Sequence, residues 1–374
     1  MSLDSPAPQS GRHTIPPASR GHHPTASEIP GVQEAGGGGI RRLCHLIASR
    51  EHGGLEKHVA DLSRWQARNT DAQVSVIAHP RYQNTLDEKV RFIPLNTDRS
   101  RHHPTLIWRL ANHIRAGEFQ IAHGHGSKSA QLLAAVQKYT DARQVITRHN
   151  VRHPRDKLAS AFDARIAVSR TSVANSRLSW NIIPNGVDTG AQTPAPLEFH
   201  LGPAPHILVA TRLVKLRGVD LLLEALTQVP EARLIALGDG PEKSNLEQLA
   251  KDLQLDSRVN FVGHTDKVGA FMRVADLLVV PSSNEDASYT LVEALLNRCP
   301  VISSRVGDAE DYVPGEYLLD APEPAQLAEK LRYALRDRER LSTDFAPAFA
   351  RAAGELTLDT MAQATWRVYS RLVD

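Results

Sequence analysis

The stretch that decides the fold runs from Asp276 to Ser304 and reads DLLVVPSSNEDASYTLVEALLNRCPVISS. It opens with the apolar run LLVV, passes through a polar segment and helix-forming residues, and ends in a second short apolar run. Short strands that are almost wholly apolar and alternate with helices are typical of a parallel sheet buried on both faces. The stretch therefore predicts a β-α-β unit whose polar segment lies at the carboxyl edge of the sheet.

Two glutamates, Glu285 and Glu293, stand in this unit with seven residues between them. The helix is predicted to begin near Ser288–Thr290, and the N–H groups of a first helical turn bind phosphate readily. Those N–H groups belong to Ser288, Tyr289, Thr290 and Leu291. One carboxylate then lies on each side of a phosphate site, as a nucleotide sugar requires. The alternative is that Glu285 is a loop charge and Glu293 a solvated helix residue.

The same alternation of short apolar runs and helical patterns continues on both sides of this unit. Candidate strands occupy residues 41–48, 72–79, 119–126, 143–149, 163–169 and 180–184, and then 206–212, 232–238, 258–263, 276–282 and 300–304. Helical patterns between them include 54–69, 129–139, 218–229, 241–255 and 267–275. This rhythm predicts an α/β protein with two Rossmann-like domains, whose parallel sheets face a central cleft.

Breaks in the pattern suggest where the domains begin and end. Residues 1–39 are rich in Pro, Ser, Gly and His, which predicts a disordered tail. A segment dense in Pro and Gly, residues 184–205, separates the two sets of strands. We therefore expect an N-terminal Rossmann-like domain over 40–186 and a C-terminal Rossmann-like domain over 187–355, the former to bind an acceptor and the latter a nucleotide sugar if the motifs below resemble those of a transferase. Residues 356–374 have helical spacing and should form a closing helix near the domain boundary.

The composition excludes several classes of protein. The chain has 374 residues and a formal net charge of only +2, which does not suggest a nucleic-acid partner. Its two cysteines, Cys44 and Cys299, offer no disulfide framework and fit a reducing cytoplasm. No apolar run approaches the roughly 20 residues of a membrane span, and no signal peptide is recognisable at the N-terminus. These features predict a cytoplasmic location.

Two further features follow predicted strands and so fall on the same cleft. Gly53 and Gly54 lie between the first strand and a helix, where glycine lets backbone approach a phosphate or sugar. Arg212, Lys215 and Arg217 follow the first strand of the second set and could stabilise a departing diphosphate. The alternatives are a plain tight turn for the glycines and a solvated loop for the basic residues.

The stretch IAHGHG places His123 and His125 at the end of another strand. An H-x-H pair can bind a metal ion, but no Asp, Glu or Cys ligand stands close by in the sequence. Hydrogen bonds from His125 to sugar hydroxyls are the favoured interpretation, and a histidine buried in the core is the alternative. The His22–His23 pair in the tail is interpreted as solvated.

A third feature is the loop TRHNVRHPRDK at residues 147–157. Its basic residues are Arg148, Arg152, Arg155 and Lys157, with His149 and His153, and only Asp156 opposes them. Unpaired charges are costly to bury, so we do not expect these residues in the core, and a solvated basic loop is the alternative. We expect His149, Arg152 and Arg155 to bind an anionic acceptor.

The segment RHHPTLIWRLANHIRAGEF, residues 101–119, suggests a contact with a membrane. Leu106, Ile107, Leu110 and Ile114 share one helical face that should pack on the sheet. Trp108 and Arg109 then lie elsewhere on the helix. An aromatic side chain among basic residues could rest on anionic lipid at the inner face of the cytoplasmic membrane. An ordinary solvated surface is the alternative.

Taken in order, these motifs resemble glycosyltransferase family 4, whose members are retaining enzymes of the GT-B fold. The resemblance spans residues 40–374 and rests on Arg212, Gly218, LGDGPEK from Leu237, the E-x7-E pair and CPVISS. It implies transfer of a hexose from a nucleotide diphosphate sugar, expected to be a UDP sugar. It also implies an acceptor that is a bacterial envelope glycan or glycolipid, such as a lipopolysaccharide core.

The resemblance also implies residue roles. Glu293 would bind the ribose, Glu285 the donor hexose, and Arg212 with Arg217 the diphosphate, while His125 would contact the sugar or the acceptor. The remaining donor-site positions are Gly53, Gly54, Gly238, Ser288, Tyr289, Thr290 and Leu291. No cofactor or metal is expected, which fits the lack of a D-x-D pair suited to Mg²⁺.

This chain departs from the family pattern at a few positions. Arg217 replaces the usual lysine, and Ser288 replaces a usual glycine. Two alternatives stay open, namely a nucleotide-sugar epimerase of the same fold and a non-catalytic nucleotide-sugar binder. A nicotinamide dehydrogenase is excluded because no G-x-G-x-x-G follows a predicted strand.

Overall fold

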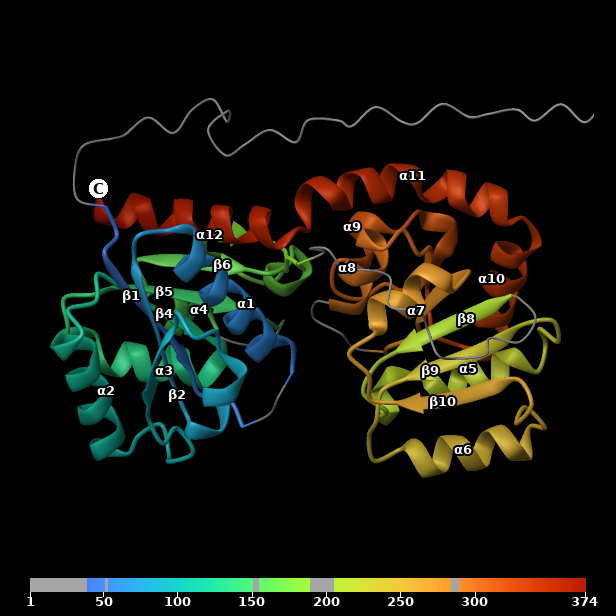
Figure 1. Ribbon diagram of the computed structural model, residues 1–374, viewed down its shortest axis with the longest axis horizontal. Coiled ribbons are helices and arrows are strands. Elements are labelled where there is room, and N and C mark those ends of the chain that lie inside the picture. The colour runs from blue at the N-terminus through green and yellow to red at the C-terminus, as the bar shows by residue number, and fades with distance from the viewer. Residues whose placement is uncertain (1–38, 51–52, 151–154, 189–204, 284–288) are drawn as a thin grey trace, which may run out of the picture. The chain divides into compact units, whose positions relative to one another are not determined.

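A computed structural model describes residues 39–50, 53–150, 155–188, 205–283 and 289–374 of the chain. Within these residues the strands form two separate parallel sheets flanked by helices, which confirms the predicted α/β architecture (Figure 1). The calls on the tail and on Arg152, Glu285 and Ser288 lie outside the described residues. The domain boundaries stay predictions.

The first sheet has the strand order β3-β2-β1-β4-β5-β6-β7 among the described residues, and all of its pairs are parallel. Its strands are β1 (Arg42–Ile47), β2 (Gln73–Ala78), β3 (Arg91–Pro94), β4 (Ile121–His125), β5 (Arg143–Arg148), β6 (Ala164–Ala167) and β7 (Asn181–Ile182). Its helices are α1 (Gly54–Asn69), η1 (Pro80–Thr85), α2 (Pro104–Ala116), α3 (Gly126–Val136), η2 (Gln137–Tyr139), α4 (Asp156–Ala159) and η3 (Thr171–Val173).

The second sheet has the order β10-β9-β8-β11-β12-β13 in the described part of the chain and is also parallel. Its strands are β8 (His206–Ala210), β9 (Arg233–Leu237), β10 (Val259–Gly263), β11 (Leu277–Val280), β12 (Val301–Ser304) and β13 (Leu318–Leu319). The helices that follow β8 are η4 (Lys215–Arg217), α5 (Val219–Leu226), α6 (Lys243–Asp252), α7 (Val268–Val274), α8 (Tyr289–Leu296), α9 (Ala309–Tyr312), η5 (Gly315–Tyr317), α10 (Pro324–Arg336), α11 (Arg338–Glu355) and α12 (Leu358–Val373).

Both sheets place their first and fourth strands side by side, so the direction of winding reverses between β1 and β4 and again between β8 and β11. Ligands of open α/β sheets bind outside the carboxyl ends of the strands at such a switch point. Gly53 and Gly54 follow β1, and His125 is the last residue of β4. Arg212 and Tyr289 lie in the segments after β8 and β11. Topology therefore brings the candidate residues of each sheet to one edge.

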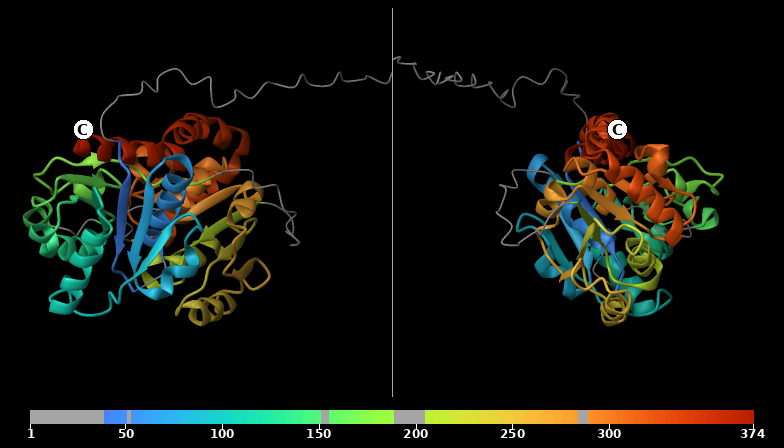
Figure 2. Two further views of the ribbon diagram at one scale, coloured as in Figure 1. Left: turned by 60° about the vertical axis from the view of Figure 1, so that its left-hand side comes forward. Right: turned by 90° about the vertical axis from the view of Figure 1, so that its right-hand side faces the viewer.

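The last two helices pack on different sheets. Phe345, Phe349 and Ala352 of α11 belong to the core of the second sheet, whereas Met361 and Tyr369 of α12 are buried with residues of the first. Figures 1 and 2 show α12, in red, along the strands of the first sheet. The turn between the helices is fixed because Val187 N–H donates to Leu356 O at 3.0 Å and Leu358 N–H donates to Val187 O at 3.0 Å.

None of the helices in the described residues is both long and apolar enough to span a bilayer. In α2 the residues Leu106, Leu110 and Ile114 are buried, as their helical spacing predicts. On the opposite side Trp108 is 62% exposed, and Arg109 and Arg115 are exposed as well.

Candidate functional site

The carboxyl edge of the first sheet begins with the turn into α1. The Gly53 N–H donates to Glu56 Oε2 at 2.8 Å, and the other oxygen of that carboxylate accepts from the Ser49 hydroxyl. The Glu56 carboxylate therefore already accepts the Gly53 N–H, whereas the sequence had suggested that this backbone lies against a phosphate or sugar of the donor. At Gly54 an added Cβ would lie 3.1 Å from Cδ2 of Tyr289, so this glycine allows α1 to approach α8.

The carboxyl edge of the second sheet presents the start of α8. This helix begins at Tyr289, so Tyr289 and Thr290 lie in its first turn, where a helix provides no acceptor for backbone N–H groups. The Thr290 hydroxyl donates to Ala210 O at 3.0 Å and fixes the helix start to the end of β8. Leu291 packs in the core. The predicted phosphate site is thus positioned at the switch point of this sheet.

Tyr289 lies between the two edges. Its ring has Lys57 Nζ of α1 at 5.7 Å from the centroid, and its hydroxyl is buried without a hydrogen-bond partner among the described residues. Burial, and then the nearby charges of Asp61 and Glu293, hold the pKa of Tyr289 well above its usual range. A buried hydroxyl with no partner is costly, which suggests a partner that arrives with a ligand.

Glu293 is half-buried on α8 and faces an ion pair on α1. Burial raises the pKa of Glu293, while Lys57 lowers it and Asp61 raises it. Lys57 Nζ is bound 2.9 Å from Asp61 Oδ2, so its charge is shared between the two carboxylates. Glu293 also lines a cavity of about 420 Å³ together with Lys57, Asp188 and His264, a size in the range of ligand sites.

The basic residues after β8 lie on the loop that leads into η4. Arg212 is exposed and Arg217 is half-buried. The Ser283 N–H donates to Leu216 O at 3.0 Å, which places this loop beside the segment that follows β11. The two arginines therefore share the carboxyl edge with α8, as predicted.

Gly238 has a packing role that the sequence did not reveal. Its φ is +122°, and an added Cβ would lie 1.9 Å from Thr211 O. The loop after β9 is thereby pressed against the loop that carries Arg212. Gly238 shapes the donor edge through this backbone contact.

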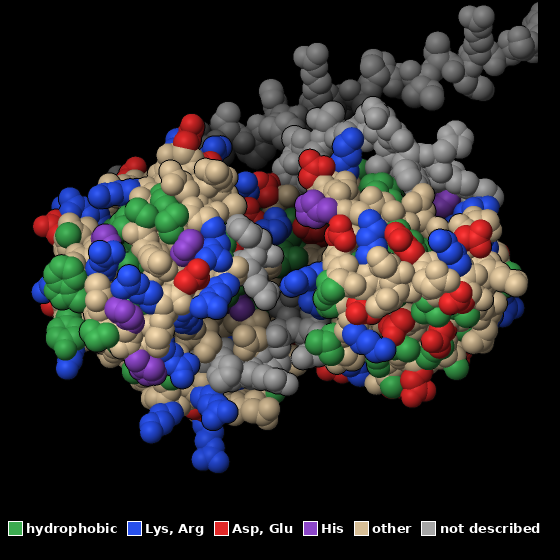
Figure 3. All heavy atoms as spheres, turned by 90° about the horizontal axis from the view of Figure 1, so that it is seen from below, with side chains coloured by type: hydrophobic (Ala, Val, Ile, Leu, Met, Phe, Trp, Pro, Cys, Tyr) green, Lys and Arg blue, Asp and Glu red, His purple; other side chains and the backbone are tan. Residues whose placement is uncertain are grey.

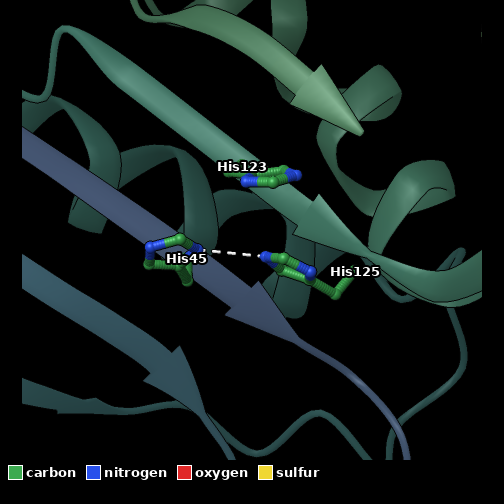
Figure 4. Close-up of side chains that lie close together, drawn as sticks. All are labelled: His45, His123 and His125. Carbon is green, nitrogen blue, oxygen red and sulfur yellow. Dashed lines mark hydrogen bonds between the residues drawn. The ribbon is translucent and has the colours of Figure 1, made fainter. Parts of the chain in front are cut away.

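Five histidines gather at the carboxyl edge of the first sheet: His45, His58, His123, His125 and His149. His45 pairs in register with His123 on the neighbouring strand, and His125 lies two residues further on the same face. Figure 4 shows His45 on β1 and His123 with His125 on β4, with a hydrogen bond joining His45 to His125. His58 comes from α1, and His149 directly follows β5.

The ring nitrogens of this cluster are largely engaged. His125 has Nε2 at 3.0 Å from His45 Nδ1 and Nδ1 at 3.3 Å from His149 Nε2. His45 Nε2 lies 2.8 Å from Gln66 Oε1, and His58 Nδ1 lies 3.1 Å from Asn185 Oδ1. His125 therefore contacts a sugar only if the cluster rearranges, whereas the half-buried His149 is the member nearer to solvent.

Burial keeps these imidazoles neutral. It lowers the pKa of His45 and of His58 to about 4. The pKa values of His123, His125 and His149 lie well below the usual range, because burial is reinforced by repulsion from neighbouring imidazoles. At neutral pH the cluster offers uncharged nitrogens.

The predicted acceptor residues do not lie together. His149 belongs to the histidine cluster, whereas Arg155 lines a separate cavity of about 750 Å³ with Arg101, His102 and Lys157. The Asp156 carboxylate does not face this cavity's cations, because it accepts hydrogen bonds from the Ser176 hydroxyl at 2.6 Å and from the Arg177 N–H at 2.7 Å. The expectation that no charge of this loop lies in the core is wrong for Arg148, which is buried because its guanidinium lies over the Trp180 ring and donates to Asn150 O at 3.0 Å.

The surface around this second cavity is basic. Arg101, Arg155 and Lys157 form no ion pair with any other described residue, so their charges are not neutralised. Figure 3 shows Lys and Arg, in blue, gathered over the left-hand part of the molecule, where the first sheet lies. We call Arg101, His102, Arg155 and Lys157 the basic cavity.

Sequence reasoning missed His45 and His58 as members of the site. His45 lies inside an apolar strand and His58 inside a helical pattern, so neither position looks exceptional. The available signal was the strand order, because β1 beside β4 brings two histidine-bearing strands into register. Without that order the cluster could not be assembled.

Two family models match consecutive parts of the chain. The model described as "Glycosyltransferase Family 4" covers residues 52–191, and "Glycosyl transferases group 1" covers residues 200–348. The O-antigen biosynthesis glycosyltransferase WclY of Escherichia coli is 31% identical over 51% of this chain and 56% of its own length. The lipopolysaccharide core biosynthesis glycosyltransferase LpsE of Rhizobium meliloti is 36% identical over 27% of this chain and 30% of its own. The matches thus span about half, or less, of these relatives.

Solved structures share the fold over most of the chain. A glycosyltransferase from Rickettsia africae superimposes with a TM-score of 0.79 at 16% identity, covering 90% of this chain and 99% of its own. Anabaena Alr3699/HepE, in complex with UDP and glucose, gives 0.75 at 20% identity, with 88% and 99% covered. The solved structures show the GT-B fold, and the two family models, which together match most of the chain, show that it belongs to the family 4-like glycosyltransferases.

Proposed function

We propose that the protein transfers a hexose from a UDP sugar to an anionic glycan or glycolipid of the bacterial envelope, with retention of anomeric configuration. Two comparisons support this proposal, since one structural neighbour was solved with UDP-glucose and two relatives are named for O-antigen and lipopolysaccharide core biosynthesis. The observation that carries the proposal is Glu293, half-buried in a cavity at the switch point of the second sheet.

The nucleotide is proposed to occupy this cavity. The Glu293 carboxylate accepts hydrogen bonds from the ribose hydroxyls, and His264 with Thr265, which follow β10, lie where the base would rest. A charge-assisted hydrogen bond of this kind contributes about 1.5–3 kcal/mol. Burial raises the pKa of Glu293, and Lys57 across the cavity opposes this rise.

The diphosphate is proposed to lie at the start of α8. The N–H groups of Tyr289 and Thr290 and the positive end of the helix dipole favour an anion there. Arg212 and Arg217 approach from the neighbouring loop. Their charges stabilise the diphosphate most strongly as it leaves, when its negative charge grows. Glu285, which lies outside the described residues, is proposed to hold the donor hexose.

The reaction needs one bond to break and one to form at the anomeric carbon. The bond from this carbon to the diphosphate oxygen breaks, and a bond to an acceptor hydroxyl oxygen forms on the same face. The proton of that hydroxyl passes to the departing phosphate oxygen. The protein then contributes by positioning the reactants and by stabilising charge, without a metal or cofactor.

The acceptor is proposed to be anionic because the charges of the basic cavity have no ion-pair partner among the described residues. A phosphate or carboxylate on the acceptor would bind Arg101, Arg155 and Lys157, and each desolvated contact would contribute on the order of 1–3 kcal/mol. We also propose that Arg152 adds to this surface. The double substitution Arg155→Ala with Lys157→Ala should raise the acceptor KM and leave the affinity for UDP unchanged.

A peripheral contact with anionic lipid is the remaining proposal for this part of the molecule. It rests on Trp108, which is 62% exposed beside Arg109 on α2. Flotation with vesicles that contain anionic lipid should recover the wild-type protein and less of a Trp108→Ala variant. Equal recovery of both proteins, or equal recovery with neutral vesicles, would dismiss the contact.

Product analysis tests the proposed reaction. The purified protein, UDP-glucose and a dephosphorylated or phosphorylated lipopolysaccharide core should release UDP and give an α-linked hexose, which nuclear magnetic resonance of the product identifies. Transfer should be faster to the phosphorylated acceptor. Conversion of the UDP sugar to its epimer without transfer would favour an epimerase, and binding without any turnover would favour a non-catalytic binder.

A further inference from the structure

The histidine cluster raises a question of proton placement. A neutral imidazole carries one N–H and one lone pair, so each close contact between two rings needs a donor on one side. The five rings are held neutral by burial, and each of them lies within hydrogen-bonding distance of at least one partner. These partners determine where the protons are.

The chain of contacts begins at Gln66. Its Oε1 can only accept, so His45 Nε2 at 2.8 Å carries the proton and His45 Nδ1 is a lone pair. His125 Nε2, 3.0 Å from that lone pair, must then donate to it. It follows that His125 Nδ1 is a lone pair, and this nitrogen faces His149 Nε2.

A second chain leads to His58. Asn185 Oδ1 accepts from His58 Nδ1 at 3.1 Å, which leaves His58 Nε2 as a lone pair. Within the described residues, the hydrogen bonds of this ring involve Nδ1 alone. The ligand nitrogens of His58, His125 and His149 all lie within 4.8 Å of one another. His58 and His125 thus each offer a lone pair here, and His149 offers one at Nε2 when its own proton lies on Nδ1.

The distance between two of these nitrogens fits a shared ion. His125 Nδ1 and His149 Nε2 are 3.3 Å apart, which is long for a hydrogen bond with a nitrogen donor. Two nitrogens that each lie about 2.0–2.1 Å from a tetrahedral zinc ion are about 3.4 Å apart. We propose that His58, His125 and His149 bind one divalent transition-metal ion, with Zn²⁺ the first choice because imidazole suits it.

The surroundings favour this ligand set over the alternative set of His45, His123 and His125, which also lie close together. Asn185 and the His45–Gln66 pair orient two of the ligands, as second-shell partners of metal-bound histidines do. His123 is a poor ligand, because its Nδ1 contacts the Tyr369 hydroxyl and its Nε2 lies 2.7 Å from Thr147 Oγ1. Three histidines leave a fourth position open for water.

Metal binding by the full-length, untagged protein tests the proposal without any sugar nucleotide. The His22–His23 pair is first replaced by alanine, so that it adds no ligands. This background protein should bind one Co²⁺ per chain with the intense visible absorption of a tetrahedral site, and one Zn²⁺ should displace it. X-ray absorption of the zinc form should show nitrogen ligands at about 2.0–2.1 Å.

Substitutions identify the ligands. His58→Ala and His149→Ala should each weaken binding at least 100-fold, and Asn185→Ala about 10–100-fold, which is typical of a lost second-shell partner. His113→Ala on α2, half-buried and outside the cluster, should bind as the background protein does. A background protein that binds no Co²⁺ at a one-to-one ratio would overturn the proposal, as would unchanged affinity in a folded His58→Ala variant. The spectroscopic result stands even if a variant does not fold.

Discussion

The two carboxyl edges share one strand order and differ in chemistry. At the first edge five neutral histidines, most of them buried, contact one another, and one of the five, His58, belongs to α1. At the second edge the start of α8, the arginine-bearing loop and Glu293 offer backbone N–H groups and charges. The difference teaches that topology sets where a ligand binds, while the residues placed there decide which part of the ligand each edge can hold.

The pH dependence of stability should separate the edges most strongly. His45 and His58 have folded-state pKa values of about 4, and the pKa values of His123, His125 and His149 are lowered well below the usual range, whereas unfolded histidines titrate near 6.5. Between these values the unfolded chain binds more protons, so stability should fall as pH falls from 6.5 to 4, and the loss should be several kcal/mol. Urea unfolding at each pH, with chelator present, measures it.

Replacing one of these histidines by a residue that cannot titrate makes this prediction more specific. His58→Asn should reduce the slope of stability against pH in that window by up to about 1.4 kcal/mol per pH unit, the value for one proton. His102→Asn, on the exposed surface, serves as the matched control and should keep the wild-type slope. Equal slopes for all three proteins would contradict the buried neutral cluster.

The next largest effect is expected at Gly238 beside the second edge. Gly238→Ala forces a Cβ to within 1.9 Å of Thr211 O at a φ of +122°, so it should destabilise by about 3 kcal/mol or more. Gly354→Ala in α11 is the control, since its Cβ meets nothing within 4 Å and should stabilise by about 0.5–1 kcal/mol. Similar urea midpoints for the two variants would refute the tight packing of this loop.

Loss of the carboxylate on α8 should follow in size. Glu293→Ala should weaken UDP binding about 10–100-fold, because a ribose loses a charge-assisted hydrogen bond of about 1.5–3 kcal/mol. Glu316→Ala, exposed on η5, is the control and should bind UDP normally. Calorimetry that finds equal affinities for the Glu293 variant and wild type would remove Glu293 from the donor site.

The smallest effect is expected at Tyr289, whose buried hydroxyl has no partner among the described residues. Tyr289→Phe should leave stability unchanged or slightly raised, because it removes an unsatisfied group. If a donor oxygen supplies the missing partner, UDP affinity should drop by about fivefold, or about 1 kcal/mol. A variant of lower stability and normal UDP affinity would show that the hydroxyl is bonded within the protein.

The sequence predicted the architecture well and the site unevenly. The apolar strands and the helix of the E-x7-E motif gave clear signals along the sequence. Strands β3 and β13 were not predicted, because β3 ends in proline and β13 has only two residues. Backbone packing at Gly238 and the joining of His45 to His125 depend on contacts between distant segments. No pattern along the chain encodes those contacts, and only the strand order brings the segments together.

Calorimetry with two ligands tests most directly whether the second edge binds the nucleotide of the donor while the first edge binds its sugar. UDP and UDP-glucose are each titrated, with chelator present, into wild type, Glu293→Ala and His149→Ala. The account predicts that Glu293→Ala weakens both ligands by the same factor, since both contain the ribose. His149→Ala, at the first edge, should weaken UDP-glucose alone. Normal binding of both ligands by the Glu293 variant, or an equal loss of both in the His149 variant, would contradict it.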